Sequence, residues 1–173
     1  LHIRRIEKIT LDGPGSIVSY VHNSVSENLG KIAVILSLKS NANQNSLENV
    51  GKKIAMHIAA SNPISLNLDG LDPKIVNKEK QVLIEQAMSS GKPKDIAEKM
   101  VEGRIRKFCD DVVLLEQTFV IDGKSKIKDV LKQYSSELGT EVSIDSFKML
   151  ILGQGIEVEE KDFAAEVAAT ANQ

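Results

Sequence analysis

The chain has 173 residues, of which 42% are hydrophobic, and its 22 Lys and Arg residues against 24 Asp and Glu residues give a formal net charge of −2 at pH 7. This length suits one domain, or one domain with a protruding module. The near-balanced charge argues against a dedicated binder of polyanions, because neutralising phosphates requires a basic excess. Only six residues are aromatic and none is Trp, so there is little from which base-stacking platforms could be built. We therefore expect no direct nucleic-acid partner.

Cysteine content and hydropathy indicate a soluble, cytoplasmic protein with no membrane partner. Cys109 is the single cysteine, which excludes an internal disulfide framework and a zinc site of several thiolates, and fits a reducing compartment. No apolar run approaches the roughly 20 residues of a membrane helix, and the opening Leu-His-Ile-Arg-Arg lacks the apolar stretch of a signal peptide. The start at Leu1 rather than Met suggests a fragment of a longer protein.

The first 40 residues predict three antiparallel strands. Residues 3–11 are rich in β-branched side chains and end in a cluster of turn formers, residues 16–22 alternate, and residues 31–38 form a continuous apolar run. Polar loops are predicted at 23–30 and 41–45.

Helical periodicity begins at Ser46, which we expect to cap a helix that ends at Asn62-Pro63 and covers one face of the sheet. Two more helices, at 73–89 and 94–109, flank a Gly and a Pro suited to ending one helix and starting the next. Their apolar stripes are narrow, which is typical of two helices packed chiefly on each other. We predict an inserted, projecting antiparallel hairpin of the coiled-coil kind.

The remaining pattern predicts short extended pieces at 112–115 and 119–121, a helix at 125–138, a strand at 142–152 and a terminal helix at about 160–171. The fold class we expect is α+β, with a small antiparallel sheet covered by helices and the helical hairpin inserted.

Motifs of covalent chemistry are missing from the sequence. It contains no phosphate-cradling Gly-Lys-Ser/Thr loop, no His-Glu-x-x-His and no Gly-x-Ser-x-Gly. Gly153-Gln154-Gly155 is typical of a turn rather than a nucleotide site. His2, His22 and His57 are far apart and better explained as surface or core side chains than as metal ligands. We expect no enzyme, no cofactor and no metal.

Charge is distributed unevenly along the chain. Residues 73–108 hold nine basic and five acidic side chains, whereas residues 141–173 hold two basic and seven acidic ones. Solvated helix faces explain this asymmetry, and an electrostatic docking surface is the alternative.

Four segments carry a family resemblance: Lys-Ile-Ala-Met-His-Ile-Ala-Ala-Ser at 53–61, Ser-Gly-Lys-Pro-Lys-Asp-Ile-Ala-Glu-Lys-Met-Val-Glu-Gly-Arg at 90–104, Leu-Glu-Gln-Thr-Phe-Val at 115–120 and Asp-Phe-Ala-Ala-Glu-Val-Ala-Ala at 162–169. Together, and in this order, they resemble bacterial translation elongation factor Ts along essentially the whole chain. The resemblance implies a protein that binds elongation factor Tu and speeds GDP release as a partner rather than as a catalyst of covalent chemistry.

The resemblance also implies a place within the family's domain organisation. The chain matches the C-terminal portion, without the N-terminal helical domain and the subdomain that carries a Thr-Asp-Phe-Val motif. Residues 1–72 and 110–158 correspond to the C-terminal core, or dimerisation, subdomain, 73–109 to its inserted coiled-coil hairpin, and 159–173 to a C-terminal helix module. A homodimer is therefore a further expectation.

Residues that contact elongation factor Tu are implied at two places. Tyr20 and His22 match a Ser-Tyr-x-His segment of the family, although the family often has Gly and a short turn after this His, where 23–30 here is extended and polar. Phe163 and Val167 match the terminal helix that leans on the partner's nucleotide domain; alternatively, both pack on this chain's own sheet. Two rival functions remain open, a structural self-association module and a ribosome- or RNA-associated domain that uses the basic hairpin.

Overall fold

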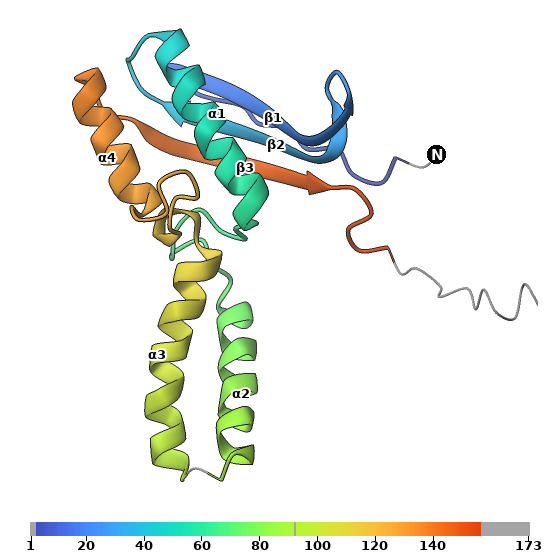
Figure 1. The fold of residues 1–173 in the computed structure, drawn as a ribbon, viewed down its shortest axis with the longest axis vertical. Helices are drawn as coiled ribbons and strands as arrows, with labels where there is room; N and C mark the ends of the chain where they lie inside the picture. The colour runs from blue at the N-terminus through green and yellow to red at the C-terminus, as the bar shows by residue number, and fades with distance from the viewer. Residues whose placement is uncertain (1–2, 92, 157–173) are drawn as a thin grey trace, which may run out of the picture.

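A computed structural model describes residues 3–91 and 93–156 of the chain (Figure 1). The predicted α+β class is confirmed: a three-stranded antiparallel sheet is combined with four α-helices in this part of the chain. In chain order, the elements are β1 (Gly15–Ser26), β2 (Leu29–Lys39), α1 (Gln44–Ser61), α2 (Pro73–Ser89), α3 (Lys94–Val112), the 3-10 helix η1 (Leu114–Glu116), α4 (Ile127–Leu138) and β3 (Ser143–Ile151).

The central strand of the sheet is β2, which pairs with β1 on one side and with β3 on the other. Val34 of β2 lies opposite Tyr20 of β1 and Met149 of β3. Successive side chains of a strand point to opposite faces. Val34, Leu36 and Leu38 are all buried and therefore face the core on one side of the sheet.

The predicted strand at 3–11 is wrong, and its place in the sheet is taken by the strand predicted at 142–152. Residues 3–11 have no regular secondary structure, and Ile3 and Ile6 are 86% and 83% exposed. These isoleucines are three residues apart, a spacing that cannot place them on one face of a strand. The segment contacts β3 through its charges: the guanidinium of Arg5 donates to the carbonyl of Ile151 at 3.5 Å.

The loop predicted at 23–30 is also wrong. β1 continues to Ser26 and β2 starts at Leu29, so only two residues connect the strands. A register shift between Ser24 and Ser26 marks a bulge, and Asn28 takes a left-handed conformation with φ 59°. Residues 23–29 are exposed, so this part of the hairpin has no apolar alternation by which a strand could be recognised.

Helices α1 and α4 cover one face of the sheet (Figure 1). Asn43, rather than the predicted Ser46, caps α1: its side chain accepts from the Ser46 N–H at 2.9 Å. The predicted stop is confirmed, since Asn62 ends α1 in the left-handed conformation. α4 begins at Ile127, two residues later than predicted. The two helices meet where Lys53 Nζ donates to the Tyr134 hydroxyl at 3.3 Å.

Helices α2 and α3 pack on each other and project away from the sheet (Figure 1). Both predicted helices exist, with α3 extending to Val112. Leu83, Ala87 and Val101 are buried within the pair.

The extended piece predicted at 112–115 is replaced by the end of α3 and by η1, with Val113 forming a single parallel bridge to Ser65. The piece at 119–121 is a turn, and the predicted terminal helix at 160–171 lies outside the described residues.

The second face of the sheet is only partly exposed, because Ser37 is 0% exposed there and Glu7 of the N-terminal segment pairs with Lys148 on the same face. Ile17 of β1 is 48% exposed, and Ser19 and Ala33 on the same face are also exposed. An antiparallel sheet commonly leaves one face to solvent, where polar side chains are the norm. Ile17 is therefore an exposed apolar residue on the uncovered part of this face.

Candidate docking site

Tyr20 and His22 lie two residues apart on β1 and therefore share a face of the strand. The Tyr20 ring is half-buried against the core, whereas His22 is exposed. The Tyr20 hydroxyl lies 3.0 Å from His22 Nδ1, and the two ring centroids are 6.0 Å apart. The pair is thus preorganised: a ring anchored in the core holds an imidazole at the surface.

Tyr20 lies at the middle of β1, and His22 lies in the half of the strand that leads to the tip of the β1–β2 hairpin. This hairpin extends beyond α1 (Figure 1). His22 lies inside β1, not at a strand end beside a long loop as predicted. Val25 and Leu29, at the tip of the hairpin, are 77% and 61% exposed. A projecting hairpin with an aromatic pair and two exposed apolar side chains is suited to docking on another protein.

Gly30 allows the two strands of this hairpin to approach closely. A Cβ atom on Gly30 would lie 2.5 Å from Val21 Cγ1 and 2.7 Å from the carbonyl oxygen of His22. Any side chain at this position would push the backbone of His22 outwards. Gly30 therefore contributes to placing the imidazole, a role that the sequence does not reveal.

The structure brings together only part of the predicted contact set. Tyr20 and His22 are neighbours, whereas Phe163 and Val167 lie outside the described residues. Sequence reasoning missed Val25 and Leu29. Their signal was visible as two apolar residues inside a segment that is otherwise polar, but without the strand register nothing showed that they stand at a hairpin tip.

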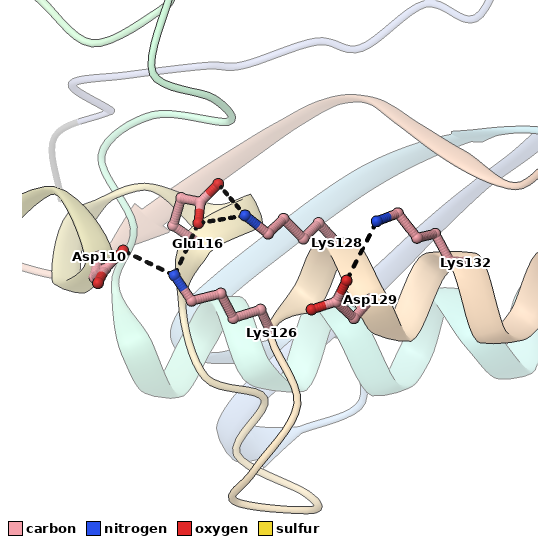
Figure 2. A network of polar contacts seen from close by, with 6 residues as sticks. All are labelled: Asp110, Glu116, Lys126, Lys128, Asp129 and Lys132. Atoms are coloured by element: carbon pink, nitrogen blue, oxygen red, sulfur yellow. Dashed lines mark hydrogen bonds and ion pairs between the residues drawn. The ribbon is translucent and has the colours of Figure 1, made fainter.

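A charged network joins the end of α3, η1 and the start of α4, as Figure 2 shows. Lys126 Nζ lies 3.0 Å from a carboxylate oxygen of Asp110 and 2.9 Å from one of Glu116, and Lys128 Nζ lies 2.8 Å from the same Glu116 oxygen. The hydrogen bonds from Lys128 and Lys126 hold the pKa of Glu116 below its ordinary value. The network fastens the base of the α2–α3 hairpin to the helical layer on the sheet.

The described residues offer neither a cluster of metal-ligating side chains nor a helix that could span a membrane. In the ranges 3–91 and 93–156, no three His, Cys, Asp or Glu side chains are grouped so as to hold a metal ion. None of the helices in the same ranges combines the length and apolar character needed to cross a membrane.

Comparison with known proteins identifies the family. The family described as Elongation factor TS matches residues 1–154. The curated relatives named Elongation factor Ts include those of Rickettsia bellii, 49% identical over 170 residues, and Erythrobacter litoralis, 47% identical over 167 residues. The chain belongs to the elongation factor Ts family.

The relatives are longer than this chain. The alignments cover 98% of the chain but 55% of the Rickettsia bellii protein, and 96% of the chain but 54% of the Erythrobacter litoralis protein. The chain thus spans about half the length of the curated relatives that it matches.

Proposed function

We propose that this chain is the C-terminal portion of a translation elongation factor that binds elongation factor Tu, and that the whole factor promotes GDP/GTP exchange by protein binding rather than by covalent catalysis. In this proposal residues 1–72 and 110–158 form the C-terminal core, 73–109 a coiled-coil hairpin and 159–173 a helical module. The cytoplasm is the compartment in which such a factor acts.

The Tyr20–His22 pair is the observation that carries the proposal. An exposed imidazole braced at 3.0 Å by an anchored tyrosine loses little conformational freedom on binding. Contact residues of this kind carry a large share of binding energy in interfaces. Phe163 and Val167 are proposed as a second contact, on the nucleotide domain of elongation factor Tu.

The test measures binding of elongation factor Tu to His22→Ala by calorimetry, together with thermal unfolding of the same preparation. Because His22 is exposed, we expect the binding free energy to weaken by about 1–2 kcal/mol while the melting temperature stays nearly unchanged. Ser19→Ala is the matched control, since Ser19 is also exposed on β1 but faces the other side of the sheet. Equal affinities for both variants and the parent would remove the pair from the site.

Self-association is a second candidate, favoured by the exposed part of the second face of the sheet. Ile17 is 48% exposed there, and Ala33 of β2, which lies opposite Val21, is also exposed on this face. A second copy of the chain packed on this face would bury both residues. Sedimentation of the parent and of Ile17→Lys tests this proposal: a dimer that Ile17→Lys dissociates supports it, and a parent that is monomeric at high concentration contradicts it.

An RNA mobility-shift assay distinguishes the remaining rival. Binding of RNA by the hairpin would weaken strongly with salt, because it would depend on lysines and arginines that release counterions. We expect no shift at physiological salt. A shift that deletion of 73–108 abolishes would favour the ribosome- or RNA-associated alternative.

A further inference from the structure

The base of the α2–α3 hairpin contains a buried polar pair that the docking site does not use. His57 of α1 is 0% exposed, and Gln117, which follows η1, is 4% exposed. His57 Nε2 lies 3.0 Å from Gln117 Oε1. Two polar side chains this deeply buried are tolerated only when their polar atoms are hydrogen-bonded. The partners of each atom therefore show which atoms are donors and which are acceptors.

The hydrogen bonds fix the protonation of the imidazole. Gln117 Nε2 donates to the carbonyl oxygens of Ser61 at 3.3 Å and Asp111 at 2.7 Å, which occupies both amide hydrogens. Gln117 Oε1 is therefore the acceptor, and His57 Nε2 carries the hydrogen. On the other side of the ring, the N–H of Val120 donates to His57 Nδ1 at 3.3 Å. Nδ1 thus has no hydrogen, and the ring is the neutral Nε2–H tautomer.

The pair connects parts of the chain that set the direction of the hairpin. His57 and Ser61 belong to α1, Asp111 to the last turn of α3, and Val120 to the loop that leads to α4. Two backbone bonds lie at the same junction: the Ile64 N–H donates to the Val112 carbonyl at 2.9 Å, and the Leu114 N–H donates to the Ser65 carbonyl at 2.8 Å. The side-chain pair is therefore part of the joint between the sheet layer and the hairpin.

Charged groups surround the joint, but the imidazole of His57 is hydrogen-bonded to neutral groups. Asp110 and Asp111 lie on α3, Glu116 on η1 and Lys126 ahead of α4, and Lys126 pairs with Asp110 and Glu116 (Figure 2). The ring itself meets Gln117, the Ser61 hydroxyl and the Val120 N–H, with the Phe119 ring 5.9 Å away. Burial lowers the pKa of His57, and the Gln117 hydrogen bond opposes this effect in part.

We propose that the neutral His57–Gln117 pair is a joint that positions the α2–α3 hairpin relative to the sheet, and that protonation of His57 loosens it. A hydrogen on Nδ1 would face the Val120 N–H, so that two donors would point at each other and this bond would be lost. The bond from Nε2 to Gln117 would remain. Acid would therefore release the loop after η1 from α1. Because Gln117, which bonds the Asp111 carbonyl at the end of α3, lies three residues before Val120 in the same connection, its hold on α3 would loosen and the hairpin would gain a wider range of directions. This inference does not depend on the proposed partner.

The test measures the distance between the hairpin tip and the sheet in the full chain. Nitroxide labels are attached to Glu27→Cys at the β1–β2 tip and to Ser89→Cys at the end of α2, both exposed, in a Cys109→Ser background. Pulsed electron spin resonance then gives the distance distribution at about pH 8 and at successively lower pH values down to the onset of acid unfolding, because burial places the pKa of His57 below the ordinary histidine value. We expect one narrow peak at the higher pH and its broadening or displacement as the pH falls.

Three variants separate positioning from mere stability. Gln117→Leu removes both amide bonds and should show the broadened distribution at every pH measured. His57→Gln keeps a donor towards Gln117 but cannot titrate, so its distribution should not change with pH. Phe119→Leu removes part of the ring contact and no hydrogen bond, so it should lower the melting temperature while keeping the narrow peak at the higher pH.

Several outcomes would overturn the proposal. A parent distribution that stays unchanged from about pH 8 down to the onset of acid unfolding contradicts acid loosening, and this comparison stands even if Gln117→Leu does not fold. If His57→Gln broadens in acid as the parent does, another group is responsible. If Phe119→Leu broadens the peak as much as Gln117→Leu does, the joint depends on packing alone and the polar pair has no positioning role.

Discussion

Gly51 marks the closest approach between α1 and the sheet. A Cβ atom at this position would lie 2.5 Å from Cγ2 of Val18 and 3.0 Å from its Cβ. Gly103 in α3 provides a contrast, since its Cβ would meet no atom within 4 Å. The same residue type therefore has a packing role in one helix and none in the other.

We expect Gly51→Ala to lower the free energy of unfolding by about 1–3 kcal/mol, because the added methyl group overpacks the contact with Val18. Gly103→Ala, the matched control, should raise it by about 0.5–1 kcal/mol through helix propensity alone. Urea unfolding measures both. Adding Val18→Ala to Gly51→Ala should recover part of the loss, whereas a Gly51→Ala variant as stable as the parent would show that α1 shifts without strain.

The lowered pKa of His57 predicts the direction in which the stability of the fold changes with pH. Burial holds its pKa below the ordinary value of 6.5. Between this lowered pKa and 6.5, the unfolded chain binds a proton that the folded chain resists, so stability must fall as the pH falls. The stabilisation is complete above 6.5 and is lost on the way down to the folded-state pKa.

Urea unfolding across this range measures the effect, and His57→Gln should flatten it. Glu116, whose pKa is lowered by Lys128 and Lys126, acts in a separate window: its stabilisation is present above the ordinary value of 4.5 and is lost as the pH falls below it. A parent whose stability is constant from neutral pH down to about pH 5 would contradict the burial of a neutral His57.

At the scale of elements, the hairpin and the sheet layer have separate interiors. Leu83, Ala87 and Val101 are buried where α2 and α3 pack together, and the main core cluster contains no residue from 73–108. The joint between them is made from residues just outside these limits, such as Ser65 and Val113.

Replacing residues 73–108 by a short flexible linker should therefore leave the sheet layer folded, with a cooperative thermal transition and a melting temperature close to that of the parent. Calorimetry of the deletion measures both properties. A replacement of the same length by a Gly/Ser linker is the control for the effect of loop closure. Loss of the cooperative transition in both would show that the hairpin belongs to the core.

The sequence predicted best those elements whose ends are marked by nearby residues, such as helix caps and helix breakers. Pro73 at the start of α2 and Gly91 between the helices gave the hairpin nearly its observed limits, because caps and helix breakers act within a few residues. The segment 3–11 is rich in β-branched residues but lacks the alternation of a strand, and composition alone does not place a segment in a sheet. At the candidate site, Tyr20 and His22 were found through family motifs, whereas the supporting Gly30 requires knowledge of the opposite strand.

For the whole molecule, we expect binding of elongation factor Tu without acceleration of GDP release by these 173 residues. The family's exchange activity is expected to depend on a Thr-Asp-Phe-Val segment, which this sequence does not contain. A ligand that binds both nucleotide states equally cannot shift the equilibrium between them. Stopped-flow release of a fluorescent GDP analogue, with a full-length family member as the positive control, measures this. Release accelerated to the level of the control would contradict the prediction.

The sequence by itself determined the family, through the order of its motifs, and the helices, because periodicity and capping are local properties. Only the tertiary structure decided that β3 completes the sheet beside β2, since strand pairing depends on backbone groups far apart in the chain. It also decided that His57 is buried and neutral. That state arises where Gln117 and Val120 return to α1 from some sixty residues away, and burial of this kind has no signature within any single segment.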